Sequence, residues 1–119
     1  MKFLLVFAGS GIGGVMRYGI SILFAPSGIK FPWATFTANI MAAFLVGLFY
    51  AIAAQKQWMD RSYLLLLTTG LCGGLSTFST FSYETIKLWE QGAVFMGCVY
   101  VVASICTCLL FTYIGSRVL

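Results

Sequence analysis

The residues best able to do chemistry lie between Gly70 and Glu84, where glycines, serines and threonines interrupt an apolar stretch long enough to cross a bilayer. Gly73 and Gly74 weaken a helix here, because glycine costs roughly 1 kcal/mol relative to alanine in a helix interior. We therefore predict that the helix is broken over residues 73–76, near the middle of the membrane. Irregular backbone at that depth must be covered by protein or line a cavity, and its carbonyls and side chains can bind a polar ligand.

Two further polar side chains lie in apolar surroundings and could contact an anion. Arg17 needs backbone carbonyls, an acidic partner or a water-filled vestibule, because an arginine inside a bilayer is costly. It is either a structural residue that caps carbonyls or part of an electropositive vestibule that concentrates anions. Asn39 lies one helical turn from Thr35, and its side-chain amide carries neutral donors. That amide could bind an anion without holding it through a full charge, or it could join two helices.

Aromatic and hydroxyl side chains extend this polar set. Phe78 and Phe81 share one face if the segment continues as a helix. Packing is the ordinary role of such rings, but the edge of an aromatic ring is electropositive and can face a small anion. The last apolar stretch carries polar side chains at every fourth position, which predicts a wettable track along one helix face. The track comprises Tyr100, Ser104, Cys108 and Thr112.

The composition is that of a membrane protein. The chain has 119 residues, of which 61% are hydrophobic and only 8% are charged, whereas soluble domains carry about 25% charged residues. At about 20 residues per crossing, the sequence predicts an all-α membrane protein with four transmembrane helices in a single domain over residues 1–119. The expected spans are residues 3–24, 33–54, 64–84 and 92–115.

The charged residues argue against several functions. They lie mainly at the ends of the expected spans, with only a small excess of basic residues on one side, which predicts that the chain can insert in both orientations. No basic face or arm is present that would bind nucleic acid. The chain has no histidine and no nucleophile beside a base, so an enzyme is not expected. The first, second and fourth spans contain no acidic residue, and Glu84 lies at the expected end of the third.

Together, these residues resemble the Fluc (CrcB) family of fluoride channels, over nearly the whole chain. The glycine-rich run of the third span is the most specific part of the resemblance, whereas the arginine and asparagine motifs alone are weak. The matching segments are Gly-Gly-Val-Met-Arg17-Tyr18, Thr35-x-x-x-Asn39 and Gly70-Leu-Cys-Gly73-Gly74-Leu-Ser76-Thr77-Phe78-Ser79-Thr80-Phe81-Ser-x-x-Glu84.

The resemblance implies a dual-topology, antiparallel homodimer in the cytoplasmic membrane of a prokaryote, with two narrow pores that export fluoride passively. It implies that Phe78 and Phe81 contact fluoride with their ring edges. It also implies a structural sodium ion (Na+) at the dimer centre, held by the backbone carbonyls of Gly73 and Ser76. Arg17 would lie near the pore mouth. The other polar pore residues would be Asn39, Thr80, Tyr100 and Ser104.

Two other interpretations stay open at this point. A small multidrug-type cation/proton exchanger has the same length, helix number and dual topology, but it needs a membrane-embedded acid that the first span lacks. A non-conducting partner subunit of a heterodimeric channel would have lost half of the pore residues, whereas the polar set here is complete.

Overall fold

The computed structural model describes residues 1–24 and 30–119, and the regular secondary structure of these residues is entirely helical. This confirms the expected all-α class. Three helices are continuous, namely α1 (Lys2–Phe24), α2 (Trp33–Gln55) and α6 (Val94–Ser116). The remaining helical region is divided into α3 (Arg61–Leu65), the π-helical segment η2 (Leu66–Cys72), α4 (Gly73–Leu75) and α5 (Ser79–Glu90).

Four helical stretches in the described residues are long and apolar enough to cross a membrane, which confirms the expected number of spans. The first, second and fourth agree with the predicted bounds to within two residues. The third runs over Arg61–Glu90 rather than residues 64–84. It continues past Glu84 because this carboxylate accepts a hydrogen bond from the hydroxyl of Tyr100 (3.2 Å), so it is not exposed to hydrocarbon without a partner.

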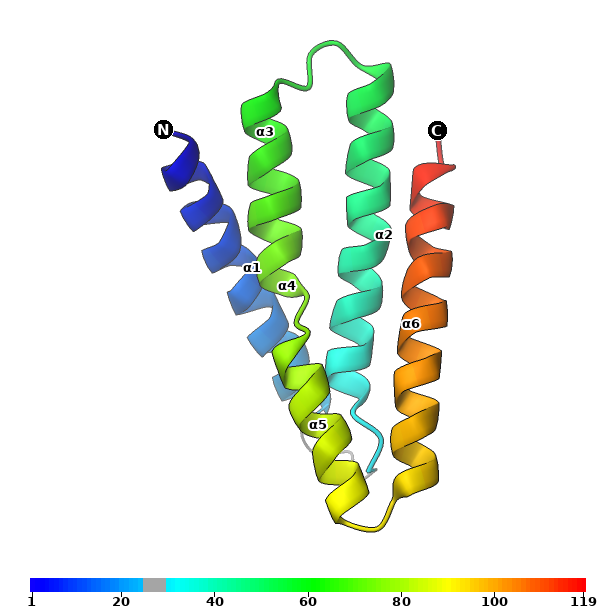
Figure 1. The fold of residues 1–119 in the computed structure, drawn as a ribbon. Coiled ribbons are helices and arrows are strands. Elements are labelled where there is room, and N and C mark those ends of the chain that lie inside the picture. The colour runs from blue at the N-terminus through cyan, green and yellow to red at the C-terminus, as the bar shows by residue number, and fades with distance from the viewer. Residues whose placement is uncertain (25–29) are drawn as a thin grey trace.

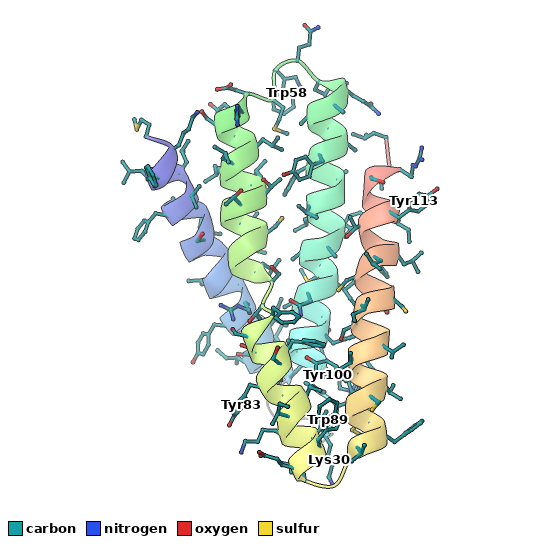
Figure 2. All side chains as sticks on the ribbon, viewed as in Figure 1. Lys30, Trp58, Tyr83, Trp89, Tyr100 and Tyr113 are labelled. Carbon is teal, nitrogen blue, oxygen red and sulfur yellow. The ribbon has the colours of Figure 1, made fainter. Side chains whose placement is uncertain are left out.

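Figure 1 shows the order in which the chain crosses the bundle. Both termini lie at the same end, which also holds the loop between α2 and α3, while the turn from α5 to α6 lies at the opposite end. Trp58 and Tyr113 are near the first end, and Lys30 and Trp89 are near the second (Figure 2). Tryptophan, tyrosine and lysine favour the two membrane–water interfaces. The long axis of the bundle therefore runs across the membrane.

Helix α1 packs closely against the first half of the third span. A Cβ atom at Gly9 would overlap the carbonyl oxygen of Leu66, and one at Gly13 would overlap the carbonyl oxygen of Leu71. Glycines four residues apart leave one helix face without side chains, which lets another helix approach closely. The backbone of the third span is thus held directly against that of α1.

This close contact makes Gly13 sensitive to substitution. Gly13→Ala should destabilise the protein by about 1–3 kcal/mol, since the added methyl group meets backbone rather than a movable side chain. Gly11→Ala is the matched control, because its Cβ meets nothing within 4 Å and alanine is the better helix former. Thermal unfolding of the detergent-solubilised protein measures both. Equal melting temperatures for the two variants would contradict the packing argument.

Two buried clusters lie on either side of the interruption in the third span. The first joins α2 to η2 and α4, through Ala38, Ala42, Cys72 and Leu75. The second joins α5 to α6, through Phe81, Leu88 and Tyr100. The two halves of the third span therefore pack against different partners, and the non-helical residues between them are held from both sides.

Candidate functional site

Helix α4 ends at Leu75, although the N–H of Ser76 still donates to the carbonyl of Cys72 (2.9 Å). Ser76 has an extended backbone (φ −79°, ψ 158°), and α5 begins only at Ser79. Residues 76–78 thus form a short non-helical segment between α4 and α5, visible as the thin connection between these helices in Figure 1. Its depth in a bilayer stays a prediction.

The break predicted over residues 73–76 is right only for Ser76, because Gly73 and Gly74 are helical and the irregular residues follow them. The reason is that glycine here serves packing. A Cβ atom at Gly74 would overlap the carbonyl oxygen of Ser10, so the missing side chain allows α4 to touch α1. The intrinsic helix-weakening effect of glycine is outweighed by this contact.

Two side chains bind the backbone of the non-helical segment. The Oδ1 atom of Asn39 accepts a hydrogen bond from the backbone N–H of Thr77 (2.8 Å), and its Nδ2 donates to the carbonyl of the same residue (3.2 Å). The hydroxyl of Thr77 in turn accepts from the backbone N–H of Thr80 (3.2 Å), in the manner of an N-cap at the start of α5. The segment is therefore tied to α2 and capped by its own side chain.

These bonds leave two backbone carbonyls without a helical partner. In an uninterrupted helix, the N–H groups of Thr77 and Thr80 would donate to the carbonyls of Gly73 and Ser76. Here both donors are engaged elsewhere, and within residues 1–24 and 30–119 no other group donates to either carbonyl. Two strong acceptors are therefore available to a ligand.

A groove of about 480 Å³ collects most of the predicted site residues. It lies between α2, α6 and the two halves of the third span, and it is open to the surface of the single chain. Among the described residues, none of those lining it is charged. Six predicted residues line the groove: Asn39, Gly73, Ser76, Phe78, Phe81 and Ser104.

The aromatic pair contributes one exposed and one buried ring to this groove. Phe78 is 79% exposed in the single chain and Phe81 only 8%. Their ring centroids are 5.7 Å apart, with the planes tilted by 41°. Phe81 is fixed by α6, since it packs on the ring of Tyr100 at 5.0 Å. The rings come together as expected, and contact with an anion stays a prediction.

Ser104 supplies a hydroxyl that has no protein partner. Its side chain is buried (6% exposed), and its Oγ atom makes no hydrogen bond in the part of the chain that the structure describes. A buried hydroxyl without a partner is destabilising by roughly 1–3 kcal/mol. Since Ser104 lines the groove, a ligand there could accept this hydrogen bond.

A second, smaller pocket of about 270 Å³ holds the other polar candidates. Arg17 and Thr80 line it, together with Thr35 and Thr77. The Nε of Arg17 donates to the carbonyl of Gly74 (3.1 Å), so this arginine caps a carbonyl and also borders a pocket. Thr77 lines both the groove and the pocket, which places the non-helical segment between the two.

Tyr100 does not line either space. It is fully buried behind Phe81 and donates its hydroxyl to Glu84, whose other described neighbours include Thr35. The first residue of the predicted hydroxyl track of α6 is thus a tyrosine that already donates its hydroxyl proton to Glu84. Glu84 lies inside the third span rather than at its end, which corrects the boundary predicted from the sequence.

Sequence reasoning missed the structural role of Thr77. The signal was present, since a threonine just before a helix commonly acts as its N-cap by accepting a hydrogen bond from the N–H two or three residues further on. The expected break at the glycines concealed it, because a cap is recognised only where a helix is expected to begin.

The fold and site define a multi-pass membrane protein whose third span is interrupted beside an uncharged, amide- and hydroxyl-lined groove. Residues 4–116 match the family described as CrcB-like protein, Camphor Resistance (CrcB). The chain therefore belongs to the CrcB family.

Curated relatives cover most of the chain. It is 41% identical over 106 residues to the fluoride-specific ion channel FluC of Granulibacter bethesdensis, which spans 88% of this chain and 84% of that protein. It is 43% identical over 105 residues to the protein of the same name from Geobacter sulfurreducens, and this match covers 87% of this chain and 85% of that protein. A third relative of that name, from Phocaeicola vulgatus, is 37% identical over 115 residues, or 96% and 94% of the two chains.

Proposed function

We propose that this protein is a fluoride-selective channel that exports fluoride passively across the cytoplasmic membrane of a prokaryote. The observation that carries the proposal is the uncharged groove at the helix interruption, which joins one amide, one free hydroxyl and two phenylalanine rings. The names and the close similarity of the curated relatives support fluoride as the transported ion.

Fluoride enters such a groove only if protein groups replace its water. Moving a bare ion into a low-dielectric medium costs tens of kcal/mol by Born estimates. Asn39 keeps one N–H of its amide beyond the one given to Thr77, and Ser104 keeps its hydroxyl proton. The ring edges of Phe78 and Phe81 add weak positive potential. Several weak, neutral sites allow an anion to enter and also to leave.

The smaller pocket serves as the vestibule in this proposal. Arg17 gives it a positive charge, and the hydroxyls of Thr80 and Thr35 give it hydrogen-bond donors. Thr77 borders both spaces, so an anion that passes this residue moves from the vestibule to the groove. A positive charge at an entrance raises the local concentration of anions.

The open groove needs a cover, and a second copy of the chain in antiparallel orientation provides it. Free carbonyls and a buried hydroxyl are costly against lipid chains, where no water completes their hydrogen bonds. The small difference in basic residues between the two ends of the bundle suits insertion in both orientations. An antiparallel pair also generates the inverted repeat on which many transport proteins are built.

The donor set at the dimer centre fits a structural sodium ion. The carbonyls of Gly73 and Ser76 lack protein donors among the described residues, and both residues line the groove. Two copies would supply four carbonyl oxygens and no carboxylate, a set that suits a hard monovalent cation. Bound there, the ion would neutralise the partial charges of these oxygens and hold the two chains together.

Flux from liposomes tests the channel. Purified protein should release trapped fluoride rapidly and leave chloride trapped, because chloride is too large for so narrow a pore. Empty liposomes are the control, and ion-selective electrodes measure both anions. Comparable release of the two anions would contradict a fluoride-selective channel. Proton-coupled uptake of an organic cation would favour the exchanger, and flux only after addition of a second, related chain would favour a heterodimer.

A further inference from the structure

We propose that Asn39 and Thr77 are positioning residues that keep the carbonyls of Gly73 and Ser76 available for a cation. Their side chains accept hydrogen bonds from the two backbone N–H groups that would otherwise donate to these carbonyls. This inference rests on the proposed sodium site and goes beyond it. It assigns a task to the Thr77 hydroxyl, and a second task to the Asn39 amide besides contact with an anion.

The first exchange involves Asn39. Its Oδ1 accepts a hydrogen bond from the backbone N–H of Thr77 at 2.8 Å. If α4 continued for one more residue, this N–H would donate to the carbonyl of Gly73. Its Nδ2 also binds the carbonyl of Thr77 at 3.2 Å, so the peptide group on either side of this residue is held by a single side chain. Two bonds from one amide fix an orientation that one bond would leave free to rotate.

The second exchange involves Thr77 itself. Its Oγ1 accepts from the N–H of Thr80 at 3.2 Å, and this N–H would otherwise return to the carbonyl of Ser76. The same hydroxyl lies 3.4 Å from the Oγ of Ser79, which keeps it at the start of α5. The side-chain cap therefore starts α5 and also frees the Ser76 carbonyl.

The two exchanges are coupled through one residue. Thr77 uses its N–H and carbonyl toward α2 and its side chain toward α5, so every polar group of this residue is engaged. The carbonyls of Gly73 and Ser76 accept no hydrogen bond in the described part of the chain, and both residues line the groove. Loss of the hydroxyl would let the Thr80 amide return to Ser76 and would remove one ligand from each subunit.

The test uses sodium-dependent stability, which is independent of anion flux. Thermal unfolding of the solubilised protein is recorded over a series of sodium concentrations, with N-methyl-D-glucamine chloride replacing sodium at constant ionic strength. Thr77→Val keeps the β-branched shape and removes the acceptor. We expect it to raise the apparent sodium dissociation constant, fitted to the rise of stability with sodium concentration, by roughly three- to tenfold, the factor that corresponds to one hydrogen bond. Thr77→Ser should restore the wild-type constant.

A matched control is provided by Thr85, whose buried hydroxyl donates to the carbonyl of Phe81 on the same helix (2.8 Å). Thr85→Val removes a threonine hydroxyl without releasing any backbone amide, so its apparent sodium dissociation constant should equal that of the wild type. Should Thr77→Val fail to assemble, Thr77→Ala removes the same oxygen without adding bulk and is measured in its place.

The outcomes separate this inference from the proposed function. If Thr77→Val and Thr85→Val lower stability by the same amount at every sodium concentration, Thr77 is only a helix cap and the inference is overturned. If wild-type protein conducts fluoride but is not stabilised by sodium, the inference is overturned while the channel stands. If it neither conducts fluoride nor responds to sodium, both proposals fail.

Discussion

Phe78→Ile and Phe81→Ile should each lower fluoride flux by roughly tenfold or more while leaving the fold intact. Isoleucine keeps apolar bulk, but it has no electropositive ring edge to face an anion. The loss of about 1.4 kcal/mol of ion stabilisation corresponds to a factor of ten. Liposome efflux measures the effect, and size-exclusion chromatography of the same samples reports assembly.

Each variant has a matched control in this chain. Phe7 is 79% exposed, as Phe78 is, but it lies on α1 away from the groove, so Phe7→Ile should retain wild-type flux. Phe36 packs in the same aromatic cluster as Phe81 without lining the groove, so Phe36→Ile isolates the effect of lost packing. Unchanged flux in Phe78→Ile and Phe81→Ile would show that both rings only pack and do not contact the anion.

Replacement of sodium by a large organic cation should destabilise the assembled protein markedly. When the sodium concentration is a hundred times the dissociation constant of the site, binding adds about 2.7 kcal/mol to the free energy of unfolding. This corresponds to a rise on the order of 10 °C in melting temperature for a chain of this size. In the proposed dimer, loss of the ion would leave the free carbonyls of Gly73 and Ser76 from both subunits close together with nothing to neutralise them. Thermal unfolding in sodium and in N-methyl-D-glucamine measures the difference.

Ser76→Ala is the control for this prediction, because the variant keeps the backbone carbonyl and loses only the side-chain hydroxyl. It should respond to sodium as the wild type does. Equal melting temperatures of the wild type in both cations would remove the sodium site from the proposal. The flux experiment with Phe78→Ile would still be decisive for the pore.

The number and approximate limits of the transmembrane helices could be predicted from the sequence, since they depend on local properties. A run of about 20 apolar residues crosses a bilayer whatever its neighbours are, and three of the four spans agree with the prediction to within two residues. The close approach permitted by Gly9 and Gly13 was also predictable, because it follows from the absence of side chains on one helix face. The polar residues of the site were recognisable because burying them in an apolar helix is costly.

The position of the helix break was decided by tertiary structure. Gly73 and Gly74 are both helical, and Gly74 packs directly against Ser10 of α1, a contact that no local propensity contains. The helix ends after Leu75 because Asn39, which is 38 residues away in the sequence, takes the amide of Thr77. A helix continues where its backbone groups find partners along the helix, and it ends where a side chain from elsewhere competes for them.

The division of the polar residues between two spaces was likewise decided by packing. Thr80 belongs to the pocket beside Arg17, and Tyr100 is buried with its hydroxyl on Glu84. Helical spacing assigns a residue to a face, but it does not say which neighbouring helix covers that face. The third span changes direction at residues 76–78, so its two halves present different faces to α2 and α6. The candidate site residues could therefore be recognised in the sequence, whereas their arrangement depends on hydrogen bonds between distant helices.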